Sequence, residues 1–145
     1  MKDLKMYING RFVESRSGEW IDVLNPSTEE VCSRQPNGTI EDVEEALDAA
    51  KAAQKAWEKV PAVERGEYLK KIAAGVKERR DEFIEIIMRE QGKTRTWATI
   101  EVDATIGYFD YMASFARHIE GEIIQSDNRG ETILLSKKPI GVVAG

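Results

Sequence analysis

The strongest constraint on the fold is a helical periodicity that runs from residue 39 to residue 120. Apolar residues recur there at spacings of three and four, which places them along one face of successive amphipathic helices. Three such stripes follow one another in the chain. They consist of Ile40, Val43, Leu47, Ala50, Ala53 and Trp57, then of Leu69, Ile72, Ala73, Val76, Phe83 and Ile87, and then of Trp97, Ile100, Ala104, Tyr108, Tyr111, Phe115 and His118.

Local signals mark the ends of these helices. Thr39 followed by Asp42 is a capping-box arrangement that opens the first helix. Pro61 suits the first turn of the second helix, because the nitrogen there needs no intrahelical hydrogen bond. Gly92 suits the end of the second helix, and Gly121 lies near the end of the third. We therefore predict three long helices.

Short strands are predicted before the helices. Residues 5–13 alternate around the dipeptide NG, which is typical of a two-residue hairpin turn. A second pair of strands, residues 21–26 and 29–36, is separated by the turn-forming sequence NPS. The first part of the chain is therefore expected to consist of short strands and turns.

Strands are predicted again after the helices. Residues 122–127 and 131–139 flank the turn sequence NRG. The closing sequence IGVVAG, residues 140–145, is uncharged and rich in β-branched residues, which is typical of a strand buried inside a parallel sheet. Such a strand needs a crossover and a partner strand. We therefore expect this chain to be the front part of a larger protein.

Composition narrows the class of protein. The formal net charge of −5 and the lack of a basic stripe argue against nucleic acid as a partner. No apolar stretch approaches the roughly 20 residues that a membrane span needs, so no membrane partner is predicted. The single cysteine, Cys32, excludes an internal disulfide and a multi-cysteine zinc site, and it suits a reducing, cytoplasmic compartment.

The residues provide no recognisable catalytic centre. Cys32 has no histidine nearby and only Arg34 as a neighbouring cation, so we interpret it as a structural strand cysteine rather than a nucleophile. His118, the only histidine, lies near a helix end and is interpreted as a packing or capping group. Four acidic residues at the start of the first helix are expected to face water without an acid–base role: Glu41, Asp42, Glu44 and Glu45.

The order of several motifs resembles the amino-terminal portion of the aldehyde dehydrogenase superfamily. The segments MYINGRFVES and IDVLNPSTEEV resemble its first strands, and AAQKAW and EQGKT resemble its paired helices and the turn after them. The segment FDYMASFAR, followed by EGEIIQSD, most resembles the lactaldehyde and glycolaldehyde dehydrogenase branch. Together these segments span about 140 residues of this sequence.

The resemblance implies an α/β fold, the amino-terminal part of a coenzyme-binding domain. Residues 1–121 would be the amino-terminal hairpins and helical shell, and residues 122–138 the arm strands that reach into neighbouring subunits. Residues 139–145 would be the first strand of a truncated dinucleotide-binding sheet. The arm implies a homo-oligomer.

The resemblance also implies NAD(P)-dependent oxidation of a small aldehyde, such as lactaldehyde, to the carboxylate. The family's catalytic cysteine, general-base glutamate and dinucleotide-contacting residues have no matching position in residues 1–145, so the chain alone is expected to be inactive. A second possibility stays open at this point. The chain could be a non-enzymatic helical module, derived from the same family, that associates with itself or binds a partner.

Two partial sites are implied by the same resemblance. In several family members a monovalent cation is held by backbone oxygens and an acidic side chain, which match the carbonyls of Val23 and Leu24 and the carboxylate of Glu90. The alternative is that Glu90 only caps or salt-links the end of the second helix. The family's third helix lines the substrate tunnel, which would place the aldehyde near the following residues: Glu101, Thr105 and Tyr108.

Overall fold

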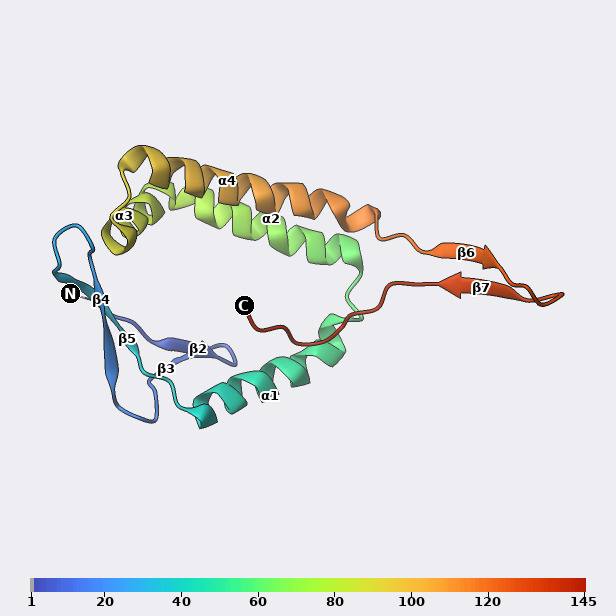
Figure 1. Cartoon of the computed structure of the whole chain (residues 1–145), viewed down its shortest axis with the longest axis horizontal. Coiled ribbons are helices and arrows are strands. Elements are labelled where there is room, and N and C mark those ends of the chain that lie inside the picture. The colour runs from blue at the N-terminus through green and yellow to red at the C-terminus, as the bar shows by residue number, and fades with distance from the viewer. Residues whose placement is uncertain (1) are drawn as a thin grey trace.

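The computed structural model describes residues 2–145 and shows a mixed α/β chain in which helices and small sheets are segregated (Figure 1). The helices are α1 (Ile40–Trp57), α2 (Ala62–Glu78), α3 (Arg80–Gln91) and α4 (Arg95–Ser114), and α4 is followed by a single 3₁₀ turn, η1 (Phe115–Arg117). The strands are β1 (Lys2–Asp3), β2 (Met6–Ile8), β3 (Arg11–Val13), β4 (Trp20–Leu24), β5 (Val31–Pro36), β6 (Glu122–Gln125) and β7 (Thr132–Leu135).

The predicted first hairpin is confirmed. Strands β2 and β3 pair antiparallel, with Tyr7 opposite Phe12. Asn9 and Gly10 between them both have positive φ, 48° and 77°, as a type I′ turn requires. A turn of this type matches the twist of the flanking strands, which is why two residues suffice to reverse the chain.

The second predicted pair is also confirmed, and it gains a strand that the sequence did not indicate. Strands β4 and β5 pair antiparallel, and β1 adds to the other edge of β5 in parallel. The guanidinium of Arg34 donates to both carboxylate oxygens of Asp3, at 2.9 and 2.7 Å, and lies over the ring of Trp20. The hydrogen bond from Arg34 lowers the pKa of Asp3. One arginine thus ties all three strands together.

The second predicted helix is divided in two. The backbone of Arg79 leaves the helical region, with φ −104° and ψ 23°, and separates α2 from α3. The apolar spacing could not indicate this break, because Val76 and Phe83 lie seven residues apart and keep the helical period across it. Both side chains pack against the same core cluster, so the break redirects the chain without losing its buried face.

The main core lies where α3 meets α4. Ile84, Ala98 and Val102 are each at most 2% exposed and form its centre. Full burial of an isoleucine such as Ile84 is worth about 2 kcal/mol. The other end of α4 meets α2 at Gly66, where a Cβ would lie 3.0 Å from the Cβ of Ala116. Small residues on α2 and α4 therefore permit a close approach of the two helices.

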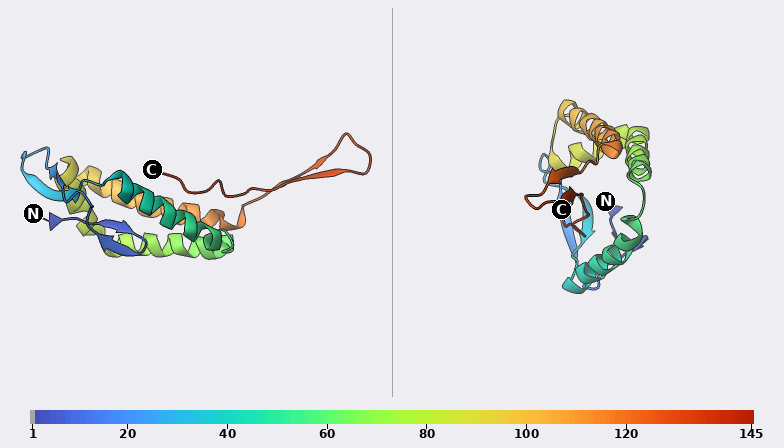
Figure 2. Two further views of the ribbon diagram at one scale, coloured as in Figure 1. Left: turned by 90° about the horizontal axis from the view of Figure 1, so that it is seen from below. Right: turned by 90° about the vertical axis from the view of Figure 1, so that its right-hand side faces the viewer.

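Helix α1 stands apart from this core (Figures 1 and 2). Its predicted apolar stripe is largely exposed, with Ile40 at 75% and Val43 at 55%. The predicted capping box at its start is confirmed, because Thr39 and Asp42 exchange hydrogen bonds between side chain and backbone. A polar network at the start of α1 fixes its position.

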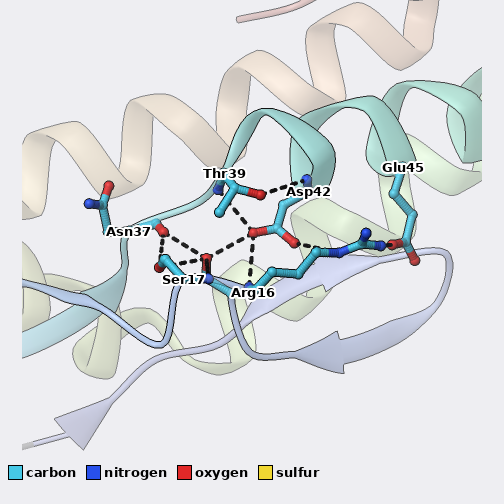
Figure 3. Close-up of polar contacts among 7 residues, drawn as sticks. Arg16, Ser17, Asn37, Thr39, Asp42 and Glu45 are labelled. Carbon is cyan, nitrogen blue, oxygen red and sulfur yellow. Dashed lines mark hydrogen bonds and ion pairs between the residues drawn. The ribbon is translucent and has the colours of Figure 1, made fainter.

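Asp42 is the centre of that network (Figure 3). Its carboxylate accepts hydrogen bonds from the hydroxyl of Ser15 at 2.8 Å, from the backbone nitrogen of Arg16 at 3.2 Å and from that of Thr39 at 3.0 Å. The guanidinium of Arg16 lies 3.3 Å away and also pairs with Glu45. Asp42 is 4% exposed, so the expectation that it faces water is wrong. The cap was visible in the sequence, whereas its distant partner Ser15 was not.

The last two strands form a separate hairpin that projects away from the helices (Figure 2). Strands β6 and β7 pair antiparallel around the predicted turn, and their side chains are exposed on both faces. Residues 139–145 are in no strand, because no segment of residues 2–145 forms a ladder with them. The buried sheet strand expected there stays a prediction. Ile140 is 93% exposed there.

Among residues 2–145, no helix has the length and apolar character of a membrane span.

The network around Asp42 predicts an acid-sensitive attachment of α1. Hydrogen bonds to the Thr39 backbone lower the pKa of Asp42, so its contribution to stability is present above about pH 4 and is lost as the pH falls through the lowered pKa. We expect Asp42→Asn to lower the urea midpoint of unfolding at pH 7. The difference between Asp42→Asn and the wild type should shrink towards about pH 2.

The control is Asp48→Asn, which removes the same charge from an exposed position on the same helix. Equal effects of the two substitutions at pH 7 would contradict a specific role of the network.

Candidate functional site

The end of α3 is held against the loop between β4 and β5. Gly92 follows α3 in the left-handed conformation, with φ 66°. A Cβ at this glycine would lie 2.8 Å from Oγ of Ser27 and 2.9 Å from Cγ of Pro26. Only glycine satisfies both the backbone angle and the close contact. The contact brings the neighbourhood of Glu90 towards the loop that begins just after Leu24.

A cavity of about 200 Å³ lies between the sheet and α3. Among residues 2–145 the carboxylate of Glu90, which lines this cavity, has no hydrogen bond or ion pair, so the alternative that it salt-links the helix end is not what the geometry shows. The residues around the cavity are Leu4, Cys32, Ser33, Ile86, Arg89 and Glu90.

The other half of the predicted cation site lies on β4. Val23 pairs with Ser33 across the sheet, and the register shifts between Val23 and Leu24. The thiol of Cys32 donates to the Val23 carbonyl oxygen at 3.2 Å. This contact agrees with the interpretation of Cys32 as a structural strand cysteine.

The chemistry of these donors fits a monovalent cation better than a divalent metal. No group of three or more His, Cys, Asp or Glu side chains that could hold a metal ion occurs in the part of the chain that the structure describes. The candidate donors are instead one carboxylate and neutral oxygens. Oxygen ligands suit hard cations, so the type of donor fits the implied group. The guanidinium of Arg89 lines the same cavity, however, and its positive charge opposes a cation there.

The three predicted substrate residues share one face of α4. Glu101, Thr105 and Tyr108 are spaced by four and three residues, which places them above one another along the helix. Tyr108 is 64% exposed. Glu101 pairs with Lys93, and the hydroxyl of Thr105 donates to the backbone oxygen of Glu101 at 2.8 Å. None of the three lines the cavity between the sheet and α3 that Glu90 lines.

Ion pairs between α3 and α4 fix the helix that carries Glu90. Arg80 donates to both carboxylate oxygens of Asp103, at 2.6 and 2.7 Å, and Arg95 pairs with Glu85. The hydrogen bond from Arg80 lowers the pKa of Asp103. A paired arginine fork fixes direction as well as distance, so α3 is held to α4 at its start and near its middle.

His118 has the packing role that the sequence indicated. It follows η1, and its ring meets the ring of Phe115 edge-on, with centroids 6.1 Å apart.

Gly92 offers a direct test of the contact between the two halves of the candidate site. Gly18 has nearly the same angle, φ 67°, but no heavy atom within 4 Å of a Cβ. Both Gly92→Ala and Gly18→Ala carry the cost of a positive φ, and only Gly92→Ala also meets Pro26 and Ser27. We expect Gly92→Ala to be less stable than Gly18→Ala by about 1 kcal/mol or more in urea unfolding.

A stability loss of the same size in both glycine variants would show that the contact with the loop contributes nothing.

Comparison with known proteins gives one consistent result. The model of the "Aldehyde dehydrogenase family" matches residues 12–145. A lactaldehyde dehydrogenase from Escherichia coli is 53% identical over 97% of this chain, which corresponds to 29% of that protein. A 3,6-anhydro-alpha-L-galactose dehydrogenase from a Vibrio species is 40% identical over 99% of this chain and 30% of its own length.

Solved structures agree with the sequence matches. The crystal structure of lactaldehyde dehydrogenase from Escherichia coli superposes with a TM-score of 0.88 and 52% identity over 92% of this chain and 28% of that chain. A salicylaldehyde dehydrogenase from Pseudomonas putida gives a TM-score of 0.90 at 30% identity, over 97% and 29% of the two chains. The chain thus spans somewhat under a third of the relatives that it matches. It belongs to the aldehyde dehydrogenase family.

Proposed function

We propose that this chain is the amino-terminal part of an NAD(P)-dependent dehydrogenase that oxidises a small aldehyde, such as lactaldehyde, to the carboxylate. The observation that carries the proposal is the match in sequence and in fold to a lactaldehyde dehydrogenase over nearly the whole of this chain. Related structures contain NAP or NAD⁺, which supports a nicotinamide coenzyme. The free thiol of Cys32 suits a reducing cytoplasm.

The 145 residues alone are not expected to turn over aldehyde. The one thiol, Cys32, lies on a strand and donates its hydrogen to the Val23 carbonyl. A nucleophilic cysteine needs a base or a cation that stabilises its thiolate, and the hydrogen bond that Cys32 makes goes instead to a backbone carbonyl. We therefore assign no catalytic role and no coenzyme contact to this chain.

A monovalent cation forms the second part of the proposal. The carbonyl oxygens of Val23 and Leu24 and the carboxylate of Glu90 would hold it. The unpaired carboxylate of Glu90 and the contact of Gly92 with the neighbouring loop support this assignment. A cation there would tie the end of β4 to the end of α3.

We propose that the exposed face of α4 lines part of the substrate tunnel. Glu101, Thr105 and Tyr108 present a carboxylate, a hydroxyl and a phenol along one line. The pairing of Glu101 with Lys93 keeps the carboxylate in one orientation. Such a face would orient the oxygen atoms of a small hydroxyaldehyde.

The hairpin β6–β7 is the proposed means of subunit association. The chain exposes 11573 Å², whereas a compact monomer of its mass exposes about 7,500 Å². Ile123 and Leu134 of the hairpin are 79% and 73% exposed. Exposed apolar strands with free backbone edges favour pairing with another chain, so we propose a homo-oligomer.

A chimera tests the proposed activity. Residues 1–145 would replace the matching amino-terminal part of the lactaldehyde dehydrogenase from Escherichia coli. If the chain performs the same role, the chimera should oxidise lactaldehyde with kcat/KM within about tenfold of the parent enzyme, measured as NADH formation. The 145-residue chain alone, assayed in parallel, should form no NADH.

The control chimera carries Gly66→Val, which should disturb the contact between α2 and the end of α4. A folded chimera of the parent's subunit number that does not oxidise lactaldehyde would overturn the proposed function. A non-enzymatic association module would give that result.

The association proposal is tested by changing the hairpin. The double substitution Ile123→Asp and Leu134→Asp adds two charges to exposed apolar positions, so it should leave the core intact and abolish self-association in multi-angle light scattering. The control is Asn128→Asp at the turn, which should associate like the wild type. A wild-type chain that stays monomeric at high concentration would refute the proposed role of the hairpin.

A further inference from the structure

The sequence contains two Asn-Gly dipeptides, Asn9-Gly10 and Asn37-Gly38. Asparagine is a chemically labile side chain, and it loses its amide most readily before glycine, because no Cβ on the next residue hinders attack by that residue's backbone nitrogen. Both asparagines are exposed to water. They differ in their hydrogen bonds, so the fold decides which of them reacts.

Asn37 is held in place by distant residues. Its side-chain nitrogen donates to the carboxylate of Glu19 at 3.0 Å, and its backbone nitrogen donates to the Glu19 carbonyl oxygen at 2.9 Å. Its own carbonyl oxygen accepts from the hydroxyls of Ser15 and Ser17, each at 2.6 Å. Ring closure onto the Gly38 nitrogen requires rotation of the side chain and of the backbone, and these hydrogen bonds oppose both rotations.

Asn9 lacks this restraint. Among residues 2–145 its carboxamide makes no hydrogen bond. The ladder beside the turn closes at the pair of Ile8 and Arg11, so the nitrogen of Gly10 lies outside it. The hairpin has three residues in each strand and pairs with no other strand in the described part of the chain. A two-stranded sheet of this size is marginally stable, so the turn opens easily and the side chain can then reach Gly10.

We propose that Asn9 is a site of spontaneous deamidation, which places a new carboxylate against the acidic first turns of α1. The backbone nitrogen of Gly10 loses its proton and attacks Cγ of Asn9. The bond from Cγ to the amide nitrogen breaks, and ammonia leaves with that proton. Water then opens the resulting succinimide ring at either carbonyl carbon, which gives aspartate or isoaspartate at position 9. Nothing is oxidised or reduced, and water is the co-reactant.

The product carboxylate enters a surface that is already negative. Asn9 lines an open hollow at the start of α1, together with Arg16, Glu41, Glu44, Glu45, Asp48 and Ala49. Arg16 is the one cation of this set, and it is already paired with Asp42 and Glu45. A further negative charge therefore meets repulsion. The isoaspartate product also lengthens the backbone by one carbon, which disturbs the two-residue turn.

The test follows both dipeptides in one sample. The 145-residue chain is incubated in mildly alkaline buffer and then digested with trypsin, which releases the two sites in separate peptides, residues 6–11 and 35–51. Mass spectrometry with electron-transfer fragmentation measures aspartate and isoaspartate at each site. An unincubated sample corrects for conversion during the digestion.

We expect Asn9 to convert at least about tenfold faster than Asn37, because a hydrogen bond to a charged group has to break at Asn37. In guanidinium chloride the two rates should converge, since each asparagine is followed by glycine.

Glu19→Ala tests the origin of the protection. It removes the carboxylate that holds the Asn37 side chain and keeps the backbone contact, so conversion at Asn37 should rise towards that at Asn9. The rate at Asn9 should not change. The control is Glu30→Ala, because the exposed carboxylate of Glu30 makes no hydrogen bond among residues 2–145. This variant should convert like the wild type at both sites.

Asn9→Asp reproduces the charge of the product. It should lower the urea midpoint of unfolding at neutral pH, and the loss should shrink in high salt, which screens exposed charges. The loss should also be smaller in a Glu44→Gln background, because Glu44 lines the same hollow and has no ion pair within residues 2–145.

Three results would overturn the proposed site: conversion at Asn37 as fast as at Asn9 in the folded chain, no conversion at Asn9, or a difference between the sites that persists in guanidinium chloride. An Asn9→Asp midpoint equal to that of the wild type, or a loss independent of salt and of Glu44, would overturn the proposed effect of the new charge.

Discussion

The structure depends on helix α4, because it is the surface against which α2 and α3 both pack. At one end the core of Ile84, Ala98 and Val102 excludes water from the contact with α3. At the other end Gly66 lets α2 approach the backbone near Ala113. Burial of apolar side chains is the largest favourable term in folding, and in this chain it is concentrated along α4. The positions of the other elements depend on the contacts that attach them to these three helices.

The remaining elements are attached by polar contacts rather than by a shared core. The sheet meets the end of α3 through Gly92, and α1 is positioned by the carboxylate of Asp42. As a result the apolar stripe of α1 and both faces of the β6–β7 hairpin stay exposed. This pattern is what the proposed function requires of a shell: a firm helical body and surfaces that other parts of an enzyme would cover.

Features encoded by neighbouring residues could be predicted from the sequence. The turn at Asn9-Gly10 and the cap formed by Thr39 and Asp42 each depend on residues a few positions apart, and the structure confirms both. The helical stripes were likewise visible. The family resemblance located Glu90 and its proposed carbonyl partners, although composition and spacing alone gave no reason to connect residues so far apart.

Features that depend on distant residues could not be predicted. The break at Arg79 leaves the apolar period intact, so periodicity had no means of detecting it. Ser15 reaches Asp42 across 27 residues, and Glu19 reaches Asn37 across 18. The strand expected at 139–145 has no pairing partner among residues 2–145 and stays a prediction, because a strand needs a second backbone beside it.

Hydrogen–deuterium exchange of the 145-residue chain, read by mass spectrometry, tests the organisation around α4 most directly. Exchange slows where opening a segment requires disrupting buried contacts. We expect the slowest exchange in the part of α4 that contains Ala98 and Val102, and much faster exchange in α1 (Ile40–Trp57). Protection of α1 equal to that of α4 would contradict it, because α1 would then belong to the same cooperative core.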